Sequence, residues 1–166
     1  MKTVKIKLNG GIMPQKATAG AAAFDLYVPE DIELVGWRQV VGLKFSLELP
    51  NGYAATIQPR SGFSAKGIEV EEQFERPDGS ISISMVRVDG DVVRGLIDAD
   101  YRGEVGVILH FACLYTNNEV LRYTIKQGTR IAQMQIIKVP DVELVEVEEL
   151  SETDRGEGGF GSTGSK

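Results

Sequence analysis

Cysteine and long apolar runs are scarce in this sequence, and each scarcity excludes a class of protein. There is one cysteine, Cys113, among 166 residues, so no intrachain disulfide can form and no oxidising compartment is required. We expect Cys113 to be a small buried hydrophobe. The apolar run 105–115 is too short to span a bilayer and is interrupted by His110. The first eleven residues lack the apolar core of a signal peptide, so we expect a cytoplasmic protein without a membrane partner.

Basic residues are also in the minority. Eighteen lysines and arginines against 24 aspartates and glutamates give a formal net charge of −6. Nucleic acid duplexes and anionic membranes both favour basic surfaces, so neither is expected as the main partner. A local basic site for one small anion stays open. The length and the 42% hydrophobic composition are those of one globular domain with a sizeable core.

Strand patterns dominate the chain, and no segment carries a long apolar stripe of helical period. Runs rich in β-branched and aromatic residues alternate with turn signals such as those at 50–52 and 77–79. These runs lie at 4–8, 40–49, 53–57, 104–115 and 129–139. At most a short helical turn is expected, around 61–66. The pattern predicts an all-β sandwich or jelly roll.

Two segments depart from this pattern. Residues 71–94 begin with a charged stretch and continue as an alternating run around Asp89-Gly90, which is typical of a tight hairpin. That hairpin is either an ordinary meander hairpin or an inserted one. After Pro140, the strand-like stretch 141–150 could be handed to a neighbouring subunit. The glycine-rich residues 151–166 cannot pack alone.

The glycine-rich tail admits two interpretations. Residues 159–164, GFGSTG, satisfy the spacing of a dinucleotide site, but such a site needs a following helix and only two residues follow. The tail is then either a disordered linker or a flexible lid. Arg155, Phe160, backbone amides and two hydroxyls would suit a lid that closes over a nucleoside triphosphate.

Three further strings could carry chemistry, although each alone is weak. Residues 59–62, PRSG, follow a strand and form either a phosphate cradle or a solvated turn. Asp98 and Asp100 would share one face of a strand, where paired carboxylates can bind metal or divide into a base and its partner. Alternatively, they are two acids in a polar turn with Arg102 as counter-ion. The string 128–134, GTRIAQM, opens a strand and indicates little by itself.

The order of these strings is more specific than any one of them. The chain contains, in sequence, AGAAAFDLY (19–27), PRSGFSAKG (59–67), GLIDADYRGEV (95–105), GTRIAQM (128–134) and RGEGGFGSTG (155–164). This series resembles the five ordered motifs of the trimeric dUTPase family over nearly the whole chain. The resemblance implies magnesium-assisted hydrolysis of dUTP to dUMP and pyrophosphate by water attack on the α-phosphorus.

The same resemblance implies an architecture. The subunit would be a jelly roll of the β-clip type, and three subunits would form a homotrimer. Each interface site would combine motifs one, two and four of one subunit, motif three of the next and the tail of the last. The expected organisation is one β domain, 1–150, with an inserted segment 71–94 and an exchanged strand at 141–150, followed by a flexible lid, 151–166.

The resemblance also assigns roles to particular residues. Asp98 would activate water, and Tyr101 would lie under the deoxyribose and exclude a 2′-hydroxyl. Asp25 would contact magnesium through water. The other implied substrate contacts are the backbones of Gly95 and Ile97 with uracil, Phe160 stacked on uracil, and Arg60, Ser61, Gly62, Gln133, Arg155, Gly161, Ser162 and Thr163 with the phosphates.

Some positions depart from the family's motifs. Motif one usually reads GSAGYDL, whereas residues 20–26 read GAAAFDL, and Thr129 stands in motif four where aspartate is usual. Residues 71–94 are longer than the family's usual connection and resemble the insertion of staphylococcal bacteriophage dUTPases, some of which also bind a repressor protein. A repressor-binding module, with or without catalysis, is therefore the alternative function, and a decorative surface hairpin is the other explanation. Deamination of dCTP on a related fold is disfavoured by the tail.

Overall fold

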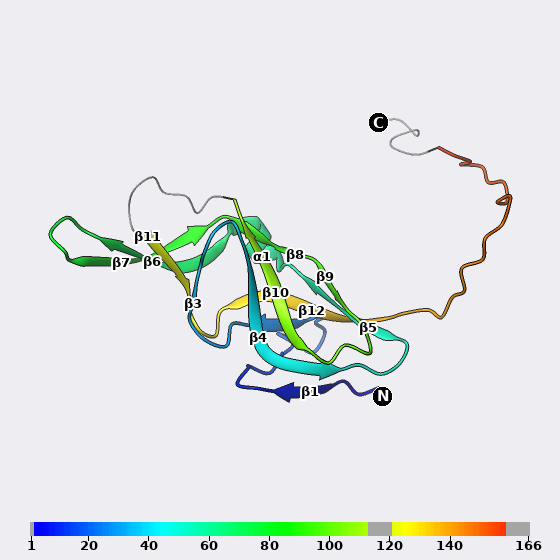
Figure 1. Ribbon diagram of the computed structural model, residues 1–166, viewed down its shortest axis with the longest axis horizontal. Coiled ribbons are helices and arrows are strands. Elements are labelled where there is room, and N and C mark those ends of the chain that lie inside the picture. The colour runs from blue at the N-terminus through cyan, green and yellow to red at the C-terminus, as the bar shows by residue number, and fades with distance from the viewer. Residues whose placement is uncertain (1, 113–120, 159–166) are drawn as a thin grey trace.

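The computed structural model describes residues 2–112 and 121–158, which form three antiparallel sheets of four strands each and one short helix (Figure 1). This is the predicted all-β jelly-roll architecture. The elements are β1 (Lys5–Leu8), β2 (Phe24–Tyr27), β3 (Ile32–Glu33), β4 (Arg38–Glu48), β5 (Tyr53–Gln58), α1 (Ser61–Lys66), β6 (Ile68–Glu75), β7 (Ile81–Val88), β8 (Gly90–Val93), β9 (Gly95–Ile97), β10 (Glu104–Phe111), β11 (Leu121–Ile125) and β12 (Arg130–Lys138). No helix in the described ranges is long and apolar enough to cross a membrane.

Strands that lie side by side come from distant parts of the sequence. The three sheets have the orders β1-β4-β10-β8, β3-β11-β6-β7 and β2-β12-β5-β9. The third sheet brings together three of the predicted motifs, because motif one forms β2, motif four opens β12, and motif two directly follows β5. The short strand β9, at the edge of this sheet, leads into motif three.

Alternating side chains of β4 and β10 face a shared hydrophobic core. Eight of them are at most 3% exposed: Val41, Leu43, Phe45, Leu47, Val105, Val107, Leu109 and Phe111. The same core contains residues of β2, β5, β6 and β12, together with Phe63 of α1. Burying a side chain of this size contributes about 1.5–3 kcal/mol relative to leaving it exposed, so the core fixes which face of each strand points inward.

The tight hairpin predicted around Asp89-Gly90 is wrong. β7 pairs along its whole length with β6, from Ile68↔Val88 to Glu75↔Ile81, and β8 pairs with β10 instead. The chain therefore passes from one sheet to another at Asp89. Gly90 permits this passage, because a Cβ built there would lie 2.5 Å from the carbonyl oxygen of His110. The alternation was a correct strand signal, but the partner of β8 lies farther along the sequence.

The true hairpin of this segment joins β6 to β7 and projects from one end of the molecule (Figure 1). Its turn contains Pro77-Asp78-Gly79, which the sequence indicated as a turn. Gly79 has a φ of +80°, and its N–H donates to the carbonyl of Arg76 at 2.8 Å. Asp78 Oδ1 accepts from the backbone N–H of Ser80 at 2.9 Å. A glycine and an aspartate thus set the bend, as is usual for turns.

Beyond β12 the chain leaves the body and extends away from it (Figure 1). The described part of this segment, residues 139–158, contains no strand. Five of its apolar side chains are 56–95% exposed: Val142, Leu144, Val145, Val147 and Leu150. The exchange of 141–150 between subunits stays a prediction. Cys113 and the tail residues Phe160, Gly161, Ser162 and Thr163 lie outside the described residues.

Candidate active site

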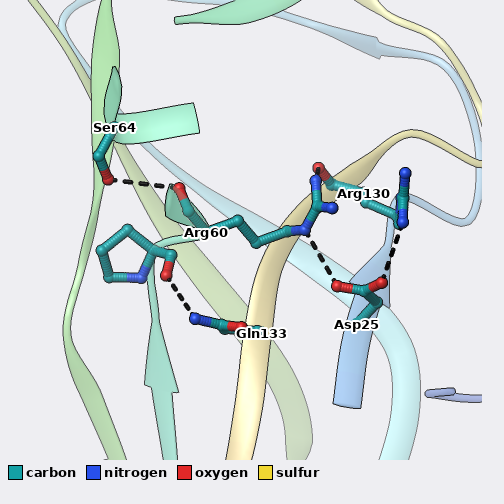
Figure 2. A network of polar contacts seen from close by, with 6 residues as sticks. Asp25, Arg60, Ser64, Arg130 and Gln133 are labelled. Atoms are coloured by element: carbon teal, nitrogen blue, oxygen red, sulfur yellow. Dashed lines mark hydrogen bonds and ion pairs between the residues drawn. The ribbon is translucent and has the colours of Figure 1, made fainter. Parts of the chain in front are cut away.

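Asp25, Arg60 and Arg130 form a charged network beside the third sheet (Figure 2). Arg60 Nε donates to Asp25 Oδ1 at 3.0 Å, and Arg130 Nη1 donates to Asp25 Oδ2 at 3.2 Å. β12 lies between β2 and β5, so its register with both strands brings these three residues together. Residues that are 35 and 105 positions apart in the sequence therefore converge on one carboxylate.

The network leaves positive charge facing solvent. The Asp25 side chain is 11% exposed, whereas those of Arg60 and Arg130 are 26% and 47% exposed. A carboxylate this deeply buried needs cationic partners, since an unpaired buried charge is costly. Two guanidinium groups share the single carboxylate, and guanidinium carries five N–H donors. Donors on both arginines are thus left to bind a further anion, and phosphate suits their geometry.

The segment after β5 turns directly into α1, as the sequence predicted. Arg60 adopts an extended backbone, and its carbonyl accepts from the N–H groups of Phe63 and Ser64 at 2.9 and 3.0 Å. The N–H groups of Ser61 and Gly62 stand in the first turn, where a helix provides no acceptor. A Cβ built on Gly62 would meet nothing within 4 Å, so this position faces open space.

Gln133 holds the loop that carries Arg60. Its side-chain Nε2 donates to the carbonyl of Pro59 at 2.9 Å (Figure 2), and its backbone lies opposite Asp25 in the β2–β12 pair. The structure therefore gathers four predicted phosphate-binding residues, Arg60, Ser61, Gly62 and Gln133, and the predicted metal residue Asp25. In the structure, Gln133 contacts the loop rather than open space.

The network borders a cavity of about 310 Å³. Its lining includes Arg60, Gly62, Lys66, Arg87, Thr129 and Arg130. Thr129 is neutral and adds no negative charge to this lining. A separate cavity of about 420 Å³ contains none of the predicted site residues and is bordered mainly by apolar side chains, among them Val4, Met13, Phe24 and Ile136.

Asp98 and Asp100 do not share a strand face, so that prediction is wrong. β9 ends at Ile97, and both aspartates lie exposed in the following turn, where the N–H of Tyr101 donates to the carbonyl of Asp98 at 3.2 Å. The alternative prediction, that the two aspartates lie in a polar turn, is correct for the backbone. Arg102 secures the turn through backbone carbonyls, because its Nη1 donates to those of Ala99 and Tyr101 at 2.7 and 2.9 Å.

The ring of Tyr101 covers Gly103. Its hydroxyl donates to the carbonyl of Glu104 at 2.9 Å, and a Cβ on Gly103 would lie 2.3 Å from that hydroxyl oxygen. Glycine at 103 is therefore required for this position of the ring, which is 45% exposed and can pack against a ligand. Gly103 was not among the predicted site residues, although its place two residues after the predicted sugar-contacting Tyr101 is a local signal in the sequence.

Within one subunit, motif three and the cationic network lie apart. In the β5–β9 pair, Ile97 lies opposite Ala55, and Asp98 follows on the side away from Arg60. From Ala55, β5 runs three more residues to Gln58, which is roughly 10 Å at 3.3 Å per residue, and Arg60 lies two residues beyond that strand end. Gly95, Ile97, Asp98 and Tyr101 thus form one group, and the network forms another.

Comparisons with known proteins identify the family. The family model described as dUTPase matches residues 9–93 and 83–164, which is most of the chain. The chain belongs to the dUTPase family. A deoxyuridine 5′-triphosphate nucleotidohydrolase of Hydrogenobaculum sp. (strain Y04AAS1) is 41% identical over 170 positions covering all of both chains. That of Nautilia profundicola is 40% identical, with 99% of each chain covered. The structure of Staphylococcus bacteriophage 80alpha dUTPase with dUPNHPP has a TM-score of 0.75 and 26% identity, covering 99% of this chain and 100% of that one.

This dUTPase is therefore an enzyme that hydrolyses dUTP to dUMP and pyrophosphate, as the motif order predicted. Arg130, which the sequence analysis left without a role, is part of its charged network. The usable signal was an arginine at the start of β12, since the register of that strand with β2 places its first residues near Asp25. Arg155, in contrast, lies in the extended C-terminal segment, where its Nε donates to the carbonyl of Gly158 at 2.7 Å.

Magnesium, which the family resemblance implies, would find few protein ligands here. Residues 2–112 and 121–158 contain no group of three or more histidine, cysteine, aspartate or glutamate side chains that could hold a metal ion. Magnesium usually keeps several waters and is held by one or two carboxylates together with substrate phosphates. Both carboxylate oxygens of Asp25 accept from arginines, so a magnesium ion here would be held mainly by the oxygens of the triphosphate, and Asp25 would reach it only through water.

Proposed function

We propose that three copies of this chain form a dUTPase trimer in which each active site combines the cationic network of one subunit with the Asp98 turn of another. The observation that carries this proposal is the antiparallel register of β5 with β9, which directs Asp98 toward the beginning of β5, whereas Arg60 follows the end of β5. Asp98 lies in the turn after β9 and Arg60 in the loop after β5, so the two side chains start from opposite ends of this strand pair. A neighbouring subunit can supply the missing half.

The C-terminal segment supports assembly. Residues 141–150 expose five apolar side chains, and the cavity of about 420 Å³ beside β1, β2 and β12 exposes apolar walls. An extended segment of one subunit, handed to the next, would cover both surfaces. Such an exchange would also direct residues 151–166 toward a site on another subunit, where Arg155, Phe160, Gly161, Ser162 and Thr163 would close over the triphosphate as a lid.

In the proposed mechanism Asp98 accepts a proton from the water that attacks the α-phosphorus. A positioned general base contributes about 10²–10⁴-fold to the rate. Arg60, the N–H groups of Ser61 and Gly62, and Gln133 would bind the phosphates, so that the charge developing on pyrophosphate is met by fixed donors. When bound, magnesium would neutralise further phosphate charge, with Asp25 contacting it through water.

Uracil and deoxyribose would be recognised by β9 and the turn that follows it. β9 is an edge strand, and an edge strand leaves a row of backbone N–H and C=O groups unpaired in its sheet. The backbones of Gly95 and Ile97 could therefore hydrogen-bond to the uracil edge. Tyr101, held over Gly103, would lie under the sugar and leave no room for a 2′-hydroxyl. A slot of fixed donors and acceptors rejects other bases because it would leave buried groups unpaired.

A pyrophosphate-release assay across dUTP, dTTP, dCTP and UTP, with and without magnesium, tests this function. We expect release from dUTP alone, and only with the metal. Equal turnover of UTP would contradict the role of Tyr101, and turnover without metal would contradict the magnesium proposal. Light scattering should give the mass of a trimer. A cytoplasmic location, where deoxynucleotides are made and used, completes the proposal.

A second candidate property, repressor binding through 71–94, has one observation in its favour. Ile81, Ile83 and Met85 alternate along β7 and are 55–65% exposed, so they form an apolar stripe on one face of the projecting hairpin. Exposed apolar patches of this kind often mark protein-binding surfaces. Ile83→Ser should abolish binding of a repressor and leave dUTP turnover unchanged, and equal binding by this variant would remove the stripe from the interface.

A further inference from the structure

The cationic cavity extends beyond the residues to which the proposed function gives a role. Lys66, the last residue of α1, and Arg87, on β7, line it together with Arg60 and Arg130. Arg87 belongs to segment 71–94, which the resemblance to known enzymes did not connect with the active site. The projecting hairpin therefore contributes a side chain to the same cavity as the phosphate-binding loop.

Arg87 lies at the rim of this cavity, and its side chain is 55% exposed. Its Nη1 donates to the carbonyl of Gly67 at 3.3 Å, and its Nη2 lies 3.6 Å from Glu69 Oε2. Gly67, with a φ of +70°, brings the end of α1 against β7, because a Cβ there would lie 2.4 Å from the carbonyl oxygen of Val88. The close contact of α1 with β7 thus depends on a glycine and sets the place of the guanidinium.

The charges around the cavity favour a polyanion. Its lining contains four cationic side chains, and Glu69 is the one carboxylate among them. Lys66 is exposed and forms no ion pair within the part of the chain that the structure describes. The cavity volume of about 310 Å³ is far above the roughly 10–15 Å³ that one water needs by the same measure, so there is room for a phosphoryl group.

We propose that Lys66 and Arg87 form a second anion subsite, adjoining the phosphate-binding loop, that binds the pyrophosphate portion of dUTP and retains pyrophosphate after hydrolysis. This inference rests on the proposed function, in which Arg60 and Gly62 hold the phosphates. It adds two residues to the substrate contacts and gives segment 71–94 a part in product release. Pyrophosphate, rather than dUMP, is then the product whose departure depends on the hairpin.

Calorimetric titration of the full chain with inorganic pyrophosphate and with dUMP tests the subsite. Removing one charge-assisted contact should weaken binding about tenfold. We therefore expect Arg87→Ala and Lys66→Ala each to weaken pyrophosphate binding by about this factor and to leave dUMP binding unchanged. Arg76→Ala is the matched control, because it removes the same charge from the far end of the same hairpin. Equal pyrophosphate affinity in Arg87→Ala and Arg76→Ala would overturn the proposal.

A variant that gains affinity separates binding from a structural role. Glu69→Gln removes the carboxylate that competes for Arg87, so it should strengthen pyrophosphate binding by about two- to threefold, the scale of an exposed ion pair. Unchanged or weaker binding would count against the subsite. A wild-type protein that does not hydrolyse dUTP would refute the proposed function, whereas normal hydrolysis with an unaltered Arg87→Ala titration would refute the subsite alone.

Discussion

Mixing two inactive variants should restore activity if the active site spans two subunits. Asp98→Asn keeps the cationic network and loses the proposed base, whereas Arg60→Ala keeps the base and loses part of the network. Arg60→Ala should still fold, because Asp25 retains its ion pair with Arg130 at 3.2 Å. The two altered positions lie toward opposite ends of β5 within one chain, so each variant chain still carries the half of the site that the other has lost.

The size of the restored activity follows from the assembly. A site is complete when the subunit giving the network carries Asp98→Asn and the neighbour giving the base carries Arg60→Ala. Random refolding of an equal mixture should therefore complete about one quarter of the sites. Asp98→Asn alone should retain about 1% of wild-type turnover or less, since a positioned base contributes about 10²–10⁴-fold. Arg60→Ala should lose a comparable factor, since removing one fixed donor to developing charge costs about 10²–10³-fold. The difference is thus more than tenfold and easy to measure by pyrophosphate release.

The matched control mixes two variants of the same motif. Asp98→Asn and Tyr101→Ala both alter the turn after β9, which comes from one subunit in every site, so this mixture should regain nothing. Light scattering should confirm that trimers form in both mixtures. Trimers of Asp98→Asn with Arg60→Ala that show only the mean of the two separate activities would refute the shared site.

Three other substitutions test single contacts. Gly103→Ala should displace the ring of Tyr101, because the added Cβ would lie 2.3 Å from the tyrosine hydroxyl oxygen. Turnover of UTP relative to dUTP should then rise, and an unchanged ratio would show that this ring does not discriminate between the sugars. Asp25→Asn leaves two guanidinium groups without their shared carboxylate and should lower the free energy of unfolding by roughly 1–3 kcal/mol in urea denaturation; an equally stable variant would show that the network does not stabilise the fold. Asp31 accepts hydrogen bonds from the Lys126 side chain and the backbone N–H of Gln127, and these lower its pKa below the ordinary value of 3.8. Its contribution to stability is therefore complete above that value and lost as pH falls through the lowered pKa, so Asp31→Asn should lessen the acid destabilisation seen below about pH 4; identical acid curves would contradict this.

The sequence predicted the class of fold because apolar and polar residues alternate along the strands that face the core. β4 and β10 each bury every second side chain, and that pattern is visible without knowledge of the partner strand. The pairing of β8 was not predictable in this way. β8 has only four residues, GDVV, its partner β10 lies beyond β9 and motif three, and the local turn signal at Asp89-Gly90 favoured the nearer strand.

Site residues that belong to the ordered motifs could be predicted from the sequence. Residues whose position depends on strand register or on strand ends could not. Asp25, Arg60 and Gln133 were identified by motif and do lie together. Arg130 was missed because its role comes from the register of β12 with β2, which fixes a contact between residues 105 positions apart. The shared face of Asp98 and Asp100 was wrong because β9 ends one residue before the first aspartate, and strand ends are set by tertiary contacts rather than by local composition.

If the Asp98 turn and the cationic network belong to different subunits, as we propose, then assembly is a condition for activity, and the C-terminal segment could supply the energy for that assembly. Burial of its five exposed apolar side chains, at about 1.5–3 kcal/mol each, contributes on the order of 10 kcal/mol per subunit. Association costs about 4–15 kcal/mol in lost translational and rotational freedom. The two quantities are comparable, so the segment can offset much of that loss without a large additional interface. The same segment continues into the tail, which means that the contact that holds a trimer together would also deliver the lid to a neighbouring site.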